Sequence, residues 1–279
     1  MQLMLFSKHV AGLPLERLIE RLKQIGLDAL DLTVRPGGHV NPAKVEDELP
    51  RVAEGLKKGG VSIGMITTNI TDAADALTPP ILKTAAKLGI KHYKLGYYPY
   101  KGFGTLEKQR AEVRARMRDL AALNRDVGIH GGFHNHSADC FGASLWDIHH
   151  VLEGIDPAWL GLYFDPAHAV IEGGSFGWMM GMDLLSTKLT MLAVKDFRWV
   201  DAGKGYAGAR RHSAQFCPLD IGNTPWPQVA KLLKKINFDG PVSLHSEYQG
   251  KHSFADLTAE EVLDQTGKDL VQFKEWMKG

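Results

Sequence analysis

Short apolar runs recur along the chain and alternate with segments of helical periodicity. The runs are rich in β-branched and aromatic residues, a composition typical of buried strands. They lie near residues 2–7, 28–34, 61–67, 91–97, 129–134, 159–164, 189–195 and 240–245. Most of the segments between them carry apolar residues on one helical face, as in residues 14–23, where the stripe comprises Leu15, Leu18, Ile19 and Leu22. The pattern therefore predicts eight strands with helices between them.

The same periodicity places further helices along the chain. One is rich in Arg and Ala over residues 111–123, one begins at Ser144, and two occupy residues 225–235 and 258–277. Successive strands are roughly 25–37 residues apart, with one longer gap between the seventh and the eighth. A helix between consecutive strands makes them parallel, and eight such units fit a chain of 279 residues. We predict an α/β fold in which residues 1–279 form a single (β/α)8 TIM-barrel domain.

A doubly wound open sheet is the competing architecture. It calls for a Gly-rich phosphate-binding turn after the first strand. Residues 7–12 read Ser-Lys-His-Val-Ala-Gly and do not form such a turn. The barrel is therefore favoured.

The composition of the chain argues against several classes of binding partner. Lys and Arg total 33 and Asp and Glu total 32, so no basic excess favours binding to nucleic acid or to an anionic membrane surface. Two cysteines cannot build a disulfide framework, and no apolar run approaches the roughly 20 residues that a membrane-spanning helix needs. We expect a cytoplasmic protein, although the chain of an exported protein without its signal would look the same.

Histidines gather at the predicted strand ends. In a barrel of this kind the active site lies at the carboxyl ends of the strands. Six of the 12 histidines fall at or just beyond these ends, namely His9, His39, His134, His136, His168 and His245. The sequence therefore predicts a site rich in imidazole at one end of the barrel.

Two strand ends combine imidazole with carboxylate. His134 and His136 alternate along a strand, so both are expected on one face, and imidazoles that converge with a carboxylate suit a divalent metal. Asp165 closes an apolar run, where burial without a cation or donors would be costly, which favours a ligand role. The alternatives are a polar strand end that bonds to neighbouring loops and, for Asp165, a cap of the following turn.

The remaining strand ends supply candidate acid and base groups. His245 and Glu247 also alternate and could face the pore, as metal ligands or as acid and base, unless Glu247 lies at the surface. Lys195 emerges from a buried strand and could act as a base, as a Schiff-base nucleophile or in a plain salt bridge. His168 could be a ligand, an acid or base, or a cap. We take Glu247, Lys195 and His168 as the candidate catalytic residues.

Other polar and aromatic groups near these ends are candidates for binding a substrate. Arg35 suits an anionic or hydroxyl-rich ligand, and aromatic rings near the loops offer the flat apolar surfaces that carbohydrate sites use. The candidate substrate-binding residues are His9, Arg35, His39, His136 and Trp199.

Five short motifs in order carry a resemblance to a known family. They are Phe133-His-Asn-His136, Phe164-Asp-Pro-Ala-His-Ala169, Val194-Lys-Asp-Phe197, Pro218-Leu-Asp-Ile-Gly222 and Gly240-Pro-Val-Ser-Leu-His-Ser-Glu-Tyr248. Over nearly its whole length the chain resembles the xylose isomerase-like TIM-barrel superfamily of sugar phosphate isomerases and epimerases. The resemblance implies a carbohydrate isomerase or epimerase that holds a divalent cation (Mn, Zn, Co or Mg) through Glu, Asp, His and Glu at the ends of strands five to eight.

The chain departs from that ligand pattern at three positions. The first Glu position is His134 and the last is His245, while the usual His is Ala193 and the Asp is retained as Asp165. The resemblance therefore implies a metal set of His134, Asp165 and His245, which Glu247 or His168 could complete. In relatives the two glutamates also shuttle protons, so their replacement puts simple epimerisation in doubt.

The chemistry implied by the resemblance is proton abstraction next to a carbonyl, with an enediolate intermediate. Return of the proton to the other carbon gives isomerisation or epimerisation, whereas departure of a β-leaving group gives elimination. A lyase or dehydratase acting on a keto-sugar is therefore the second candidate.

A non-catalytic sugar-binding relative, with Ala193 marking a lost ligand, is a further alternative. A nuclease is disfavoured because these strand ends supply too few carboxylates for a trinuclear site. The expected partner is a small-molecule sugar or sugar derivative, and the oligomeric state, a homo-oligomer included, is left open.

Overall fold

Each of the eight apolar runs forms a strand, and these strands close into one parallel barrel, which confirms the predicted fold class. This computed structural model describes residues 1–278. The barrel strands are β1 (Leu3–Phe6), β2 (Ala29–Val34), β3 (Ser62–Thr68), β4 (His92–Lys94), β6 (His130–His134), β8 (Leu160–Phe164), β9 (Leu189–Val194) and β12 (Val242–Leu244). They are hydrogen-bonded in the order β1-β12-β9-β8-β6-β4-β3-β2, and every neighbouring pair is parallel.

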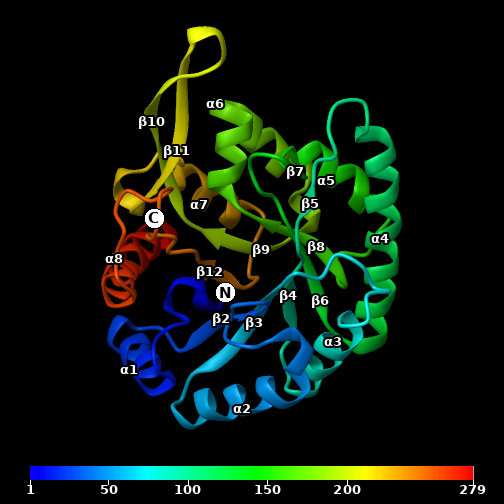
Figure 1. The fold of residues 1–279 in the computed structure, drawn as a ribbon, viewed down its shortest axis with the longest axis vertical. Helices are drawn as coiled ribbons and strands as arrows, with labels where there is room; N and C mark the ends of the chain where they lie inside the picture. The colour runs from blue at the N-terminus through cyan, green and yellow to red at the C-terminus, as the bar shows by residue number, and fades with distance from the viewer. Residues whose placement is uncertain (279) are drawn as a thin grey trace.

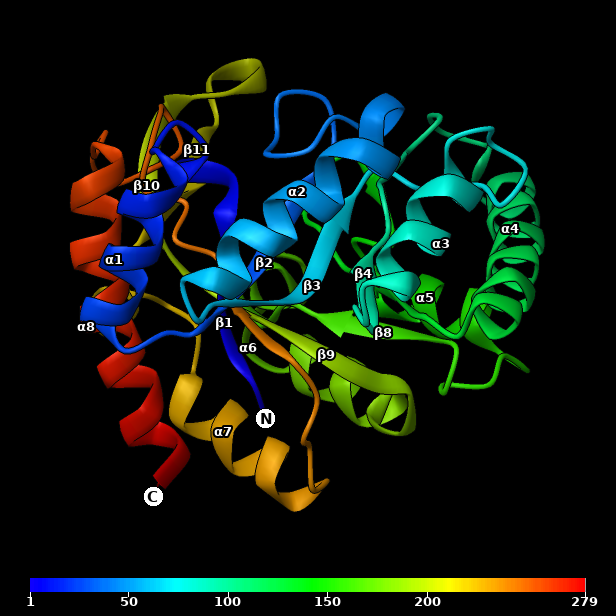
Figure 2. The same ribbon diagram turned by 90° about the horizontal axis from the view of Figure 1, so that it is seen from below.

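The helices form the outer layer around this barrel (Figures 1 and 2). They are α1 (Leu15–Ile25), α2 (Val45–Lys58), α3 (Thr78–Lys87), α4 (Leu106–Val127), α5 (Leu145–Leu152), α6 (Pro166–Leu184), α7 (Trp226–Lys235) and α8 (Ala259–Lys278). Short 3-10 turns are η1 (Ser7–Val10), η2 (Pro42–Lys44), η3 (Ser186–Lys188), η4 (Tyr206–Gly208) and η5 (Leu219–Ile221). Helix α4 is longer than the predicted 111–123, because its first turns are rich in charged residues and carry little apolar signal.

The first and last helices meet and close the outer ring. α1 and α8 lie side by side in Figure 1. Arg17 and Arg21 of α1 both form ion pairs with Glu260 of α8, at 2.7 and 2.8 Å between nitrogen and oxygen. Exposed pairs of this kind contribute little each. The apolar stripe of α1, with Leu18 and Leu22 fully buried, holds the helix in place.

A hairpin accounts for the long gap between the seventh and eighth barrel strands. β10 (Asp196–Lys204) pairs antiparallel with β11 (Arg210–Cys217), and the hairpin extends beyond the helices at the top of Figure 1. A smaller ribbon joins β5 (Tyr98–Pro99) to β7 (Cys140–Phe141). The sequence did not predict either ribbon, because the hairpin is mostly exposed and lacks the apolar run of a buried strand.

Two layers of apolar side chains stabilise the fold. The larger lies between the barrel and the helices, and the smaller lies within the barrel. The inner cluster consists of Met4, Ala29, Met65, Tyr163, Met191 and Ala193. It fills the barrel below the carboxyl ends of the strands, so these ends form the floor of an open mouth.

We expect Gly222→Ala to destabilise the fold by about 3 kcal/mol, because a Cβ at this position would overlap the buried carboxylate of Asp196. That carboxylate cannot move freely, since it accepts hydrogen bonds from the backbone N–H groups of Phe197 (2.8 Å) and Thr224 (2.9 Å). Urea unfolding measures the change. The matched control is Gly177→Ala, where the added methyl group meets no atom and a small stabilisation is expected. Equal stability of both variants would contradict the overlap.

Candidate functional site

Four buried polar side chains meet at the carboxyl ends of consecutive strands. His134 ends β6, while Asp165, Lys195 and His245 each follow directly after a strand. The strands are neighbours in the barrel, in the order β6-β8-β9-β12. Parallel strands bring their ends to the same edge, and all four side chains therefore lie close together, as the sequence predicted.

Three of these residues form a group that could hold a metal ion. One ligand atom each from His134, Asp165 and His245 lies within 4.8 Å of the others. His134 Nε2 is 3.4 Å from Asp165 Oδ2, and the two imidazole rings stack with their centroids 5.7 Å apart. Both ring nitrogens of His134 and Oδ2 of Asp165 are buried without a hydrogen-bond partner. Buried polar atoms are normally hydrogen-bonded, so atoms without a hydrogen-bond partner in such a group fit a cation-binding role.

Asp165 is fixed so that only Oδ1 accepts a hydrogen bond, while Oδ2 accepts none and lies 3.3 Å from Lys195 Nζ. Oδ1 accepts the backbone N–H of His168 at 3.0 Å, and Asp165 thereby caps α6. The side chain of Asn135 bonds to both the backbone N–H (2.8 Å) and the backbone carbonyl (2.9 Å) of Asp165. The capping alternative raised by the sequence is therefore real, and it leaves Oδ2 directed toward His134.

The candidate catalytic residues lie beside this group. Lys195 Nζ is 2.7 Å from His168 Nε2, 3.3 Å from Asp165 Oδ2 and 3.8 Å from Glu247 Oε1. His168 Nδ1 is 2.8 Å from the hydroxyl of Ser137. Lys195 therefore lies between the carboxylate of Asp165 and the more exposed carboxylate of Glu247.

The charges of the site are set mainly by burial and by Lys195. Burial acts to raise the pKa of Glu247, but Lys195 and then Lys8 outweigh it and lower the pKa to about 2. Burial likewise opposes Lys195 and His168 at Asp165, whose pKa still lies below its usual range. Burial lowers the pKa of His134, His168 and His245 well below the usual value. At neutral pH the site thus holds ionised carboxylates and neutral imidazoles.

His245 is oriented by a network beneath the site. Its Nε2 is 2.8 Å from the hydroxyl of Tyr163 and 3.9 Å from Asp31 Oδ2, and Ser243 donates to Asp31 Oδ2 at 2.9 Å. A metal-binding imidazole commonly donates its second N–H to such a partner. This leaves Nδ1, which lies 3.9 Å from Glu247 Oε1, on the open side.

Ala193 is a fully buried apolar residue of the barrel interior. It belongs to the same buried cluster as Tyr163, within the barrel. The hydroxyl of that tyrosine is 2.8 Å from His245 Nε2. The position at which the family resemblance implies a histidine is therefore part of the apolar filling of the barrel.

Two strands end earlier than the sequence suggested, but the same side chains still converge. β6 stops at His134 and β12 stops at Leu244, so His136, His245 and Glu247 follow their strands. His245 and Glu247 nevertheless approach each other, because the backbone turns tightly and Glu247 N–H donates to the carbonyl of His245 at 2.8 Å.

The predicted substrate-binding residues fall into two groups. The ring of His136 is close to His168, with centroids 4.1 Å apart, and His9 Nδ1 is 2.9 Å from Gln249 Oε1, just beyond the end of β12. These two histidines therefore lie at the mouth. His39 instead contacts the Thr33 hydroxyl at 3.2 Å, and burial alone lowers its pKa. Trp199 lies on the hairpin, where its half-exposed ring packs edge-on against Phe197. Their roles remain predictions.

Sequence reasoning missed three buried polar residues of the mouth. They are Asp31, Lys94 and Tyr163. Asp31 interrupts the apolar run of β2 between two leucines, and this position gave a usable signal, because a charged residue flanked by outward-facing leucines must point into the barrel. Burial raises the pKa of Asp31 to about 6 and lowers that of Lys94 to about 7.

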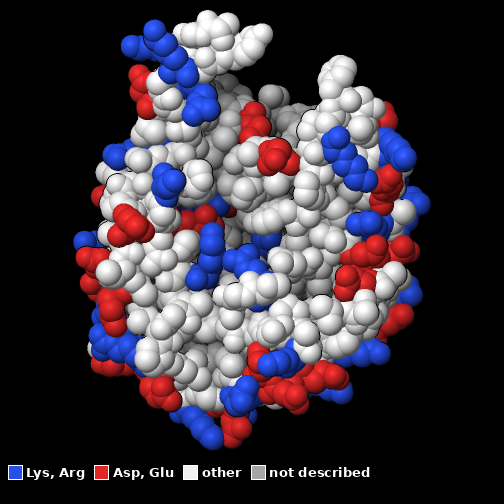
Figure 3. Space-filling view, viewed as in Figure 1, with Lys and Arg blue, Asp and Glu red and all other residues white. Residues whose placement is uncertain are grey.

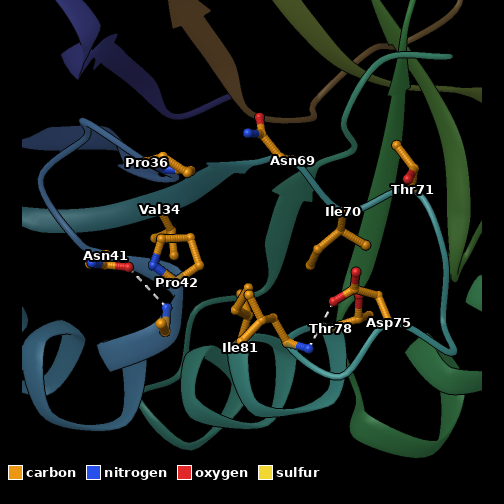
Figure 4. A pocket seen from close by; sticks show the side chains of 12 residues that line it. Val34, Pro36, Asn41, Pro42, Asn69, Ile70, Thr71, Asp75, Thr78 and Ile81 are labelled. Carbon is orange, nitrogen blue, oxygen red and sulfur yellow. Dashed lines mark hydrogen bonds between the residues drawn. The ribbon is translucent and has the colours of Figure 1, made fainter. Parts of the chain in front are cut away.

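A separate cavity lies beside the mouth and contains none of the predicted site residues. It has a volume of about 350 Å³ and is bounded by the ends of β2 and β3 and by α3. Figure 4 shows the apolar side chains of Pro42, Ile70 and Ile81 around it. Asn41 and Asp75 at its rim are occupied in local turns, through hydrogen bonds to the N–H groups of Ala43 and Leu77.

The barrel and the polar strand ends define the class: a TIM-barrel protein with a buried imidazole and carboxylate site at the mouth. The family model for the xylose isomerase-like TIM barrel matches residues 19–268, and the chain belongs to this family. No curated protein matches the chain significantly.

Solved structures with similar folds include sugar epimerases and a dehydratase. A D-psicose 3-epimerase, solved in the presence of D-fructose, is 15% identical with a TM-score of 0.68, and all of both chains is covered. A probable 3-DHS dehydratase from Bacillus anthracis is 15% identical with a TM-score of 0.69, covering 97% of this chain and 99% of that one. A xylose isomerase-like protein from Mycobacterium smegmatis, in complex with magnesium, is 15% identical with a TM-score of 0.70, covering 99% and 97%. At this identity the likeness establishes the fold.

None of the helices within residues 1–278 is long and apolar enough to cross a membrane.

Proposed function

We propose that this chain is a metal-dependent sugar isomerase or epimerase that moves a proton next to a carbonyl group. The observation that carries the proposal is the group of unpaired buried atoms on His134 and Asp165, with His245 in reach, beside the carboxylate of Glu247. A divalent cation held by two imidazoles and a carboxylate is a viable site with open positions, and Mn, Zn, Co and Mg remain the candidates. When bound, such a cation would polarise the carbonyl oxygen of the substrate.

Glu247 is the proposed base. It is ionised at neutral pH and is more exposed than Asp165 or Lys195, so a substrate in the mouth can reach it. Lys195, held by His168 and Asp165, would donate a hydrogen bond or a proton to a substrate oxygen. His9 and His136 at the mouth would bind substrate hydroxyl groups.

A single base on one side favours proton transfer between adjacent carbons, which is isomerisation. Elimination from a keto-sugar is the second candidate. It is favoured by the replacement of both glutamate ligands, because His134 and His245 cannot carry out the two-carboxylate proton shuttle that the family resemblance implies. Lys195, bonded to His168, could then protonate a departing hydroxyl group.

Hydrogen exchange with solvent tests the proposal for both reactions. The protein would be incubated in D2O with Mn²⁺ and D-fructose, D-tagatose or D-psicose, and the sugars followed by proton NMR. We expect loss of the proton signal at the carbon next to the carbonyl, with a new sugar for isomerisation or an unsaturated product for elimination. Tight binding of these sugars without any exchange would instead identify a non-catalytic sugar-binding protein.

We expect the affinity for Mn²⁺ to change by less than about threefold between pH 7.5 and 5.5. The reason is that burial lowers the pKa of His134 and His245 well below the usual value, so both stay neutral in this range. For an imidazole with an ordinary pKa of about 6.5, the protonated form would outnumber the neutral form by about ten to one at pH 5.5. With two such ligands the affinity for Mn²⁺ would fall by about 100-fold. Titration of Mn²⁺ followed by electron paramagnetic resonance measures the difference. A fall of that size would contradict the proposed burial of the ligands.

A further inference from the structure

Two cations at the barrel mouth have no carboxylate partner. Lys94, at the end of β4, is 2% exposed, and its Nζ donates to the backbone carbonyl of Leu95 at 2.7 Å. Arg35, just after β2, is partly buried. Within residues 1–278, neither side chain forms an ion pair with an acidic group at 4.0 Å or less. Lys195, by contrast, is within this distance of both Asp165 and Glu247.

Both cations lie over aromatic rings that border the candidate metal group. Lys94 Nζ is 3.8 Å from the centroid of Tyr97, whose ring is edge-on to His134 at 6.0 Å. The Arg35 guanidinium is 5.4 Å from the centroid of Phe6, whose ring stacks on His245 at 4.5 Å. A single aromatic ring therefore lies between each cation and a candidate metal ligand. Figure 3 shows Lys and Arg atoms gathered in the hollow at the centre of this face.

The charge of Arg35 also acts on Lys94. After burial, Arg35 is the main cause that lowers the pKa of Lys94, to about 7. Asp31 is a carboxylate near both, but its oxygens accept hydrogen bonds from Thr67 (2.8 Å) and Ser243 (2.9 Å). Burial of an ammonium with one hydrogen bond and no ion pair is costly, so Lys94 is only partly charged at neutral pH, and an anionic ligand would favour its charged form.

We propose that Arg35 and Lys94 bind a carboxylate group of the substrate, so that the candidate site takes a keto-sugar acid. This inference rests on the proposed function, because it assumes that the carbonyl of the same molecule lies at the metal group. The planar guanidinium can bind a carboxylate with two parallel hydrogen bonds, and Lys94 supplies a point charge.

A carboxylate fits this mouth better than a phosphate ester. Barrels of this type commonly bind phosphate after the seventh and eighth strands, through backbone N–H groups. Here the seventh strand is followed by Lys195, which already lies within 4.0 Å of both Asp165 and Glu247, and the carboxylate of Glu247 after the eighth strand would repel a dianion. The unpaired cations lie instead at the ends of β2 and β4.

Three ketoses that differ only at carbon 6 test the inference. D-Fructose, D-fructuronate and D-fructose 6-phosphate carry a hydroxymethyl, a carboxylate and a phosphate ester at this position. Calorimetric titration of the Mn²⁺-loaded protein is expected to give at least about tenfold tighter binding of D-fructuronate than of D-fructose, the share of one charge-assisted contact pair. D-Fructose 6-phosphate is expected to bind no more tightly than D-fructose.

Arg35→Met and Lys94→Met are expected to reduce the preference for D-fructuronate to about twofold or less, whereas Lys91→Met is expected to preserve it. Lys91 immediately precedes β4 at the opposite end of the barrel and is exposed, so it controls for loss of a lysine. A thermal unfolding curve for each variant establishes that it is folded, and Arg35→Met changes only a partly exposed position.

The inference is overturned if wild type binds D-fructuronate no better than D-fructose, if neither binds, or if both substitutions leave the preference intact. Tighter binding of D-fructose 6-phosphate than of D-fructuronate would overturn the assignment to a carboxylate. The proposed function can fail separately. Preferential binding of D-fructuronate without solvent deuterium exchange would retain the carboxylate subsite and remove the proposed reaction, and exchange without any preference would do the reverse.

Discussion

Replacing Glu247 by glutamine is expected to lower the rate of solvent deuterium exchange into a bound ketose by about 10²–10⁴-fold, the usual contribution of a general base. Glutamine has nearly the same shape but cannot accept the proton. Binding of the sugar and of Mn²⁺ should change little, because Glu247 lies outside the proposed ligand set of His134, Asp165 and His245.

The low pKa of Glu247, about 2, limits how strong a base it can be in the free protein. Lys195 is the largest of the charges that lower it, and it lies 3.8 Å away. Glu172→Gln, an exposed change on α6, serves as the control and should leave the rate unaltered. An exchange rate in Glu247→Gln within about threefold of wild type would assign the base to another residue, with Lys195 and His168 next in line.

Replacing Asp165 by asparagine is expected to weaken Mn²⁺ binding by about 10²–10³-fold, the share of one anionic ligand in a site of this type. The substitution removes the negative charge and changes little else. Asparagine can still accept the N–H of His168 through its side-chain oxygen, so α6 keeps its cap, while the negative charge opposite His134 is lost. Titration with Mn²⁺ gives the affinity.

Weaker Mn²⁺ binding by Asp165→Asn could come from unfolding or from loss of a metal ligand, and two measurements separate these causes. Circular dichroism and urea unfolding should give a folded protein for Asp165→Asn, since the cap is retained. Asp183→Asn, near the end of the same helix, is the matched control and should bind Mn²⁺ as wild type does. Unchanged affinity in a folded Asp165→Asn protein would remove Asp165 from the ligand set.

The barrel could be predicted from the sequence because its signals are local. Each strand is a short apolar run, and the repeated alternation with helices forces parallel neighbours. The hairpin formed by β10 and β11 could not be predicted in this way. Its stability comes from strand pairing between partly exposed residues, such as Trp199 with Ala214, rather than from an apolar run.

The residues of the candidate site also differ in whether the sequence could predict them. His134, Asp165, Lys195 and His245 could be placed together because each ends a barrel strand, and strand ends converge whatever the details of packing. Tyr163 and Lys94 lie in or beside strands and look like ordinary members of them. Tyr163 packs in the buried cluster inside the barrel, and its contact with His245 depends on packing across the barrel.

The central claim is that His134, Asp165 and His245 hold a divalent metal, and the metal content of the purified protein tests it most directly. Elemental mass spectrometry would be applied to wild type, His134→Ala, His245→Ala and the control His150→Ala, which changes an exposed residue of α5. We predict about one equivalent of Mn, Zn, Co or Mg in wild type and in the control, and its loss in both ligand variants. No metal in wild type and no uptake on addition, or full retention in both ligand variants, would contradict the account.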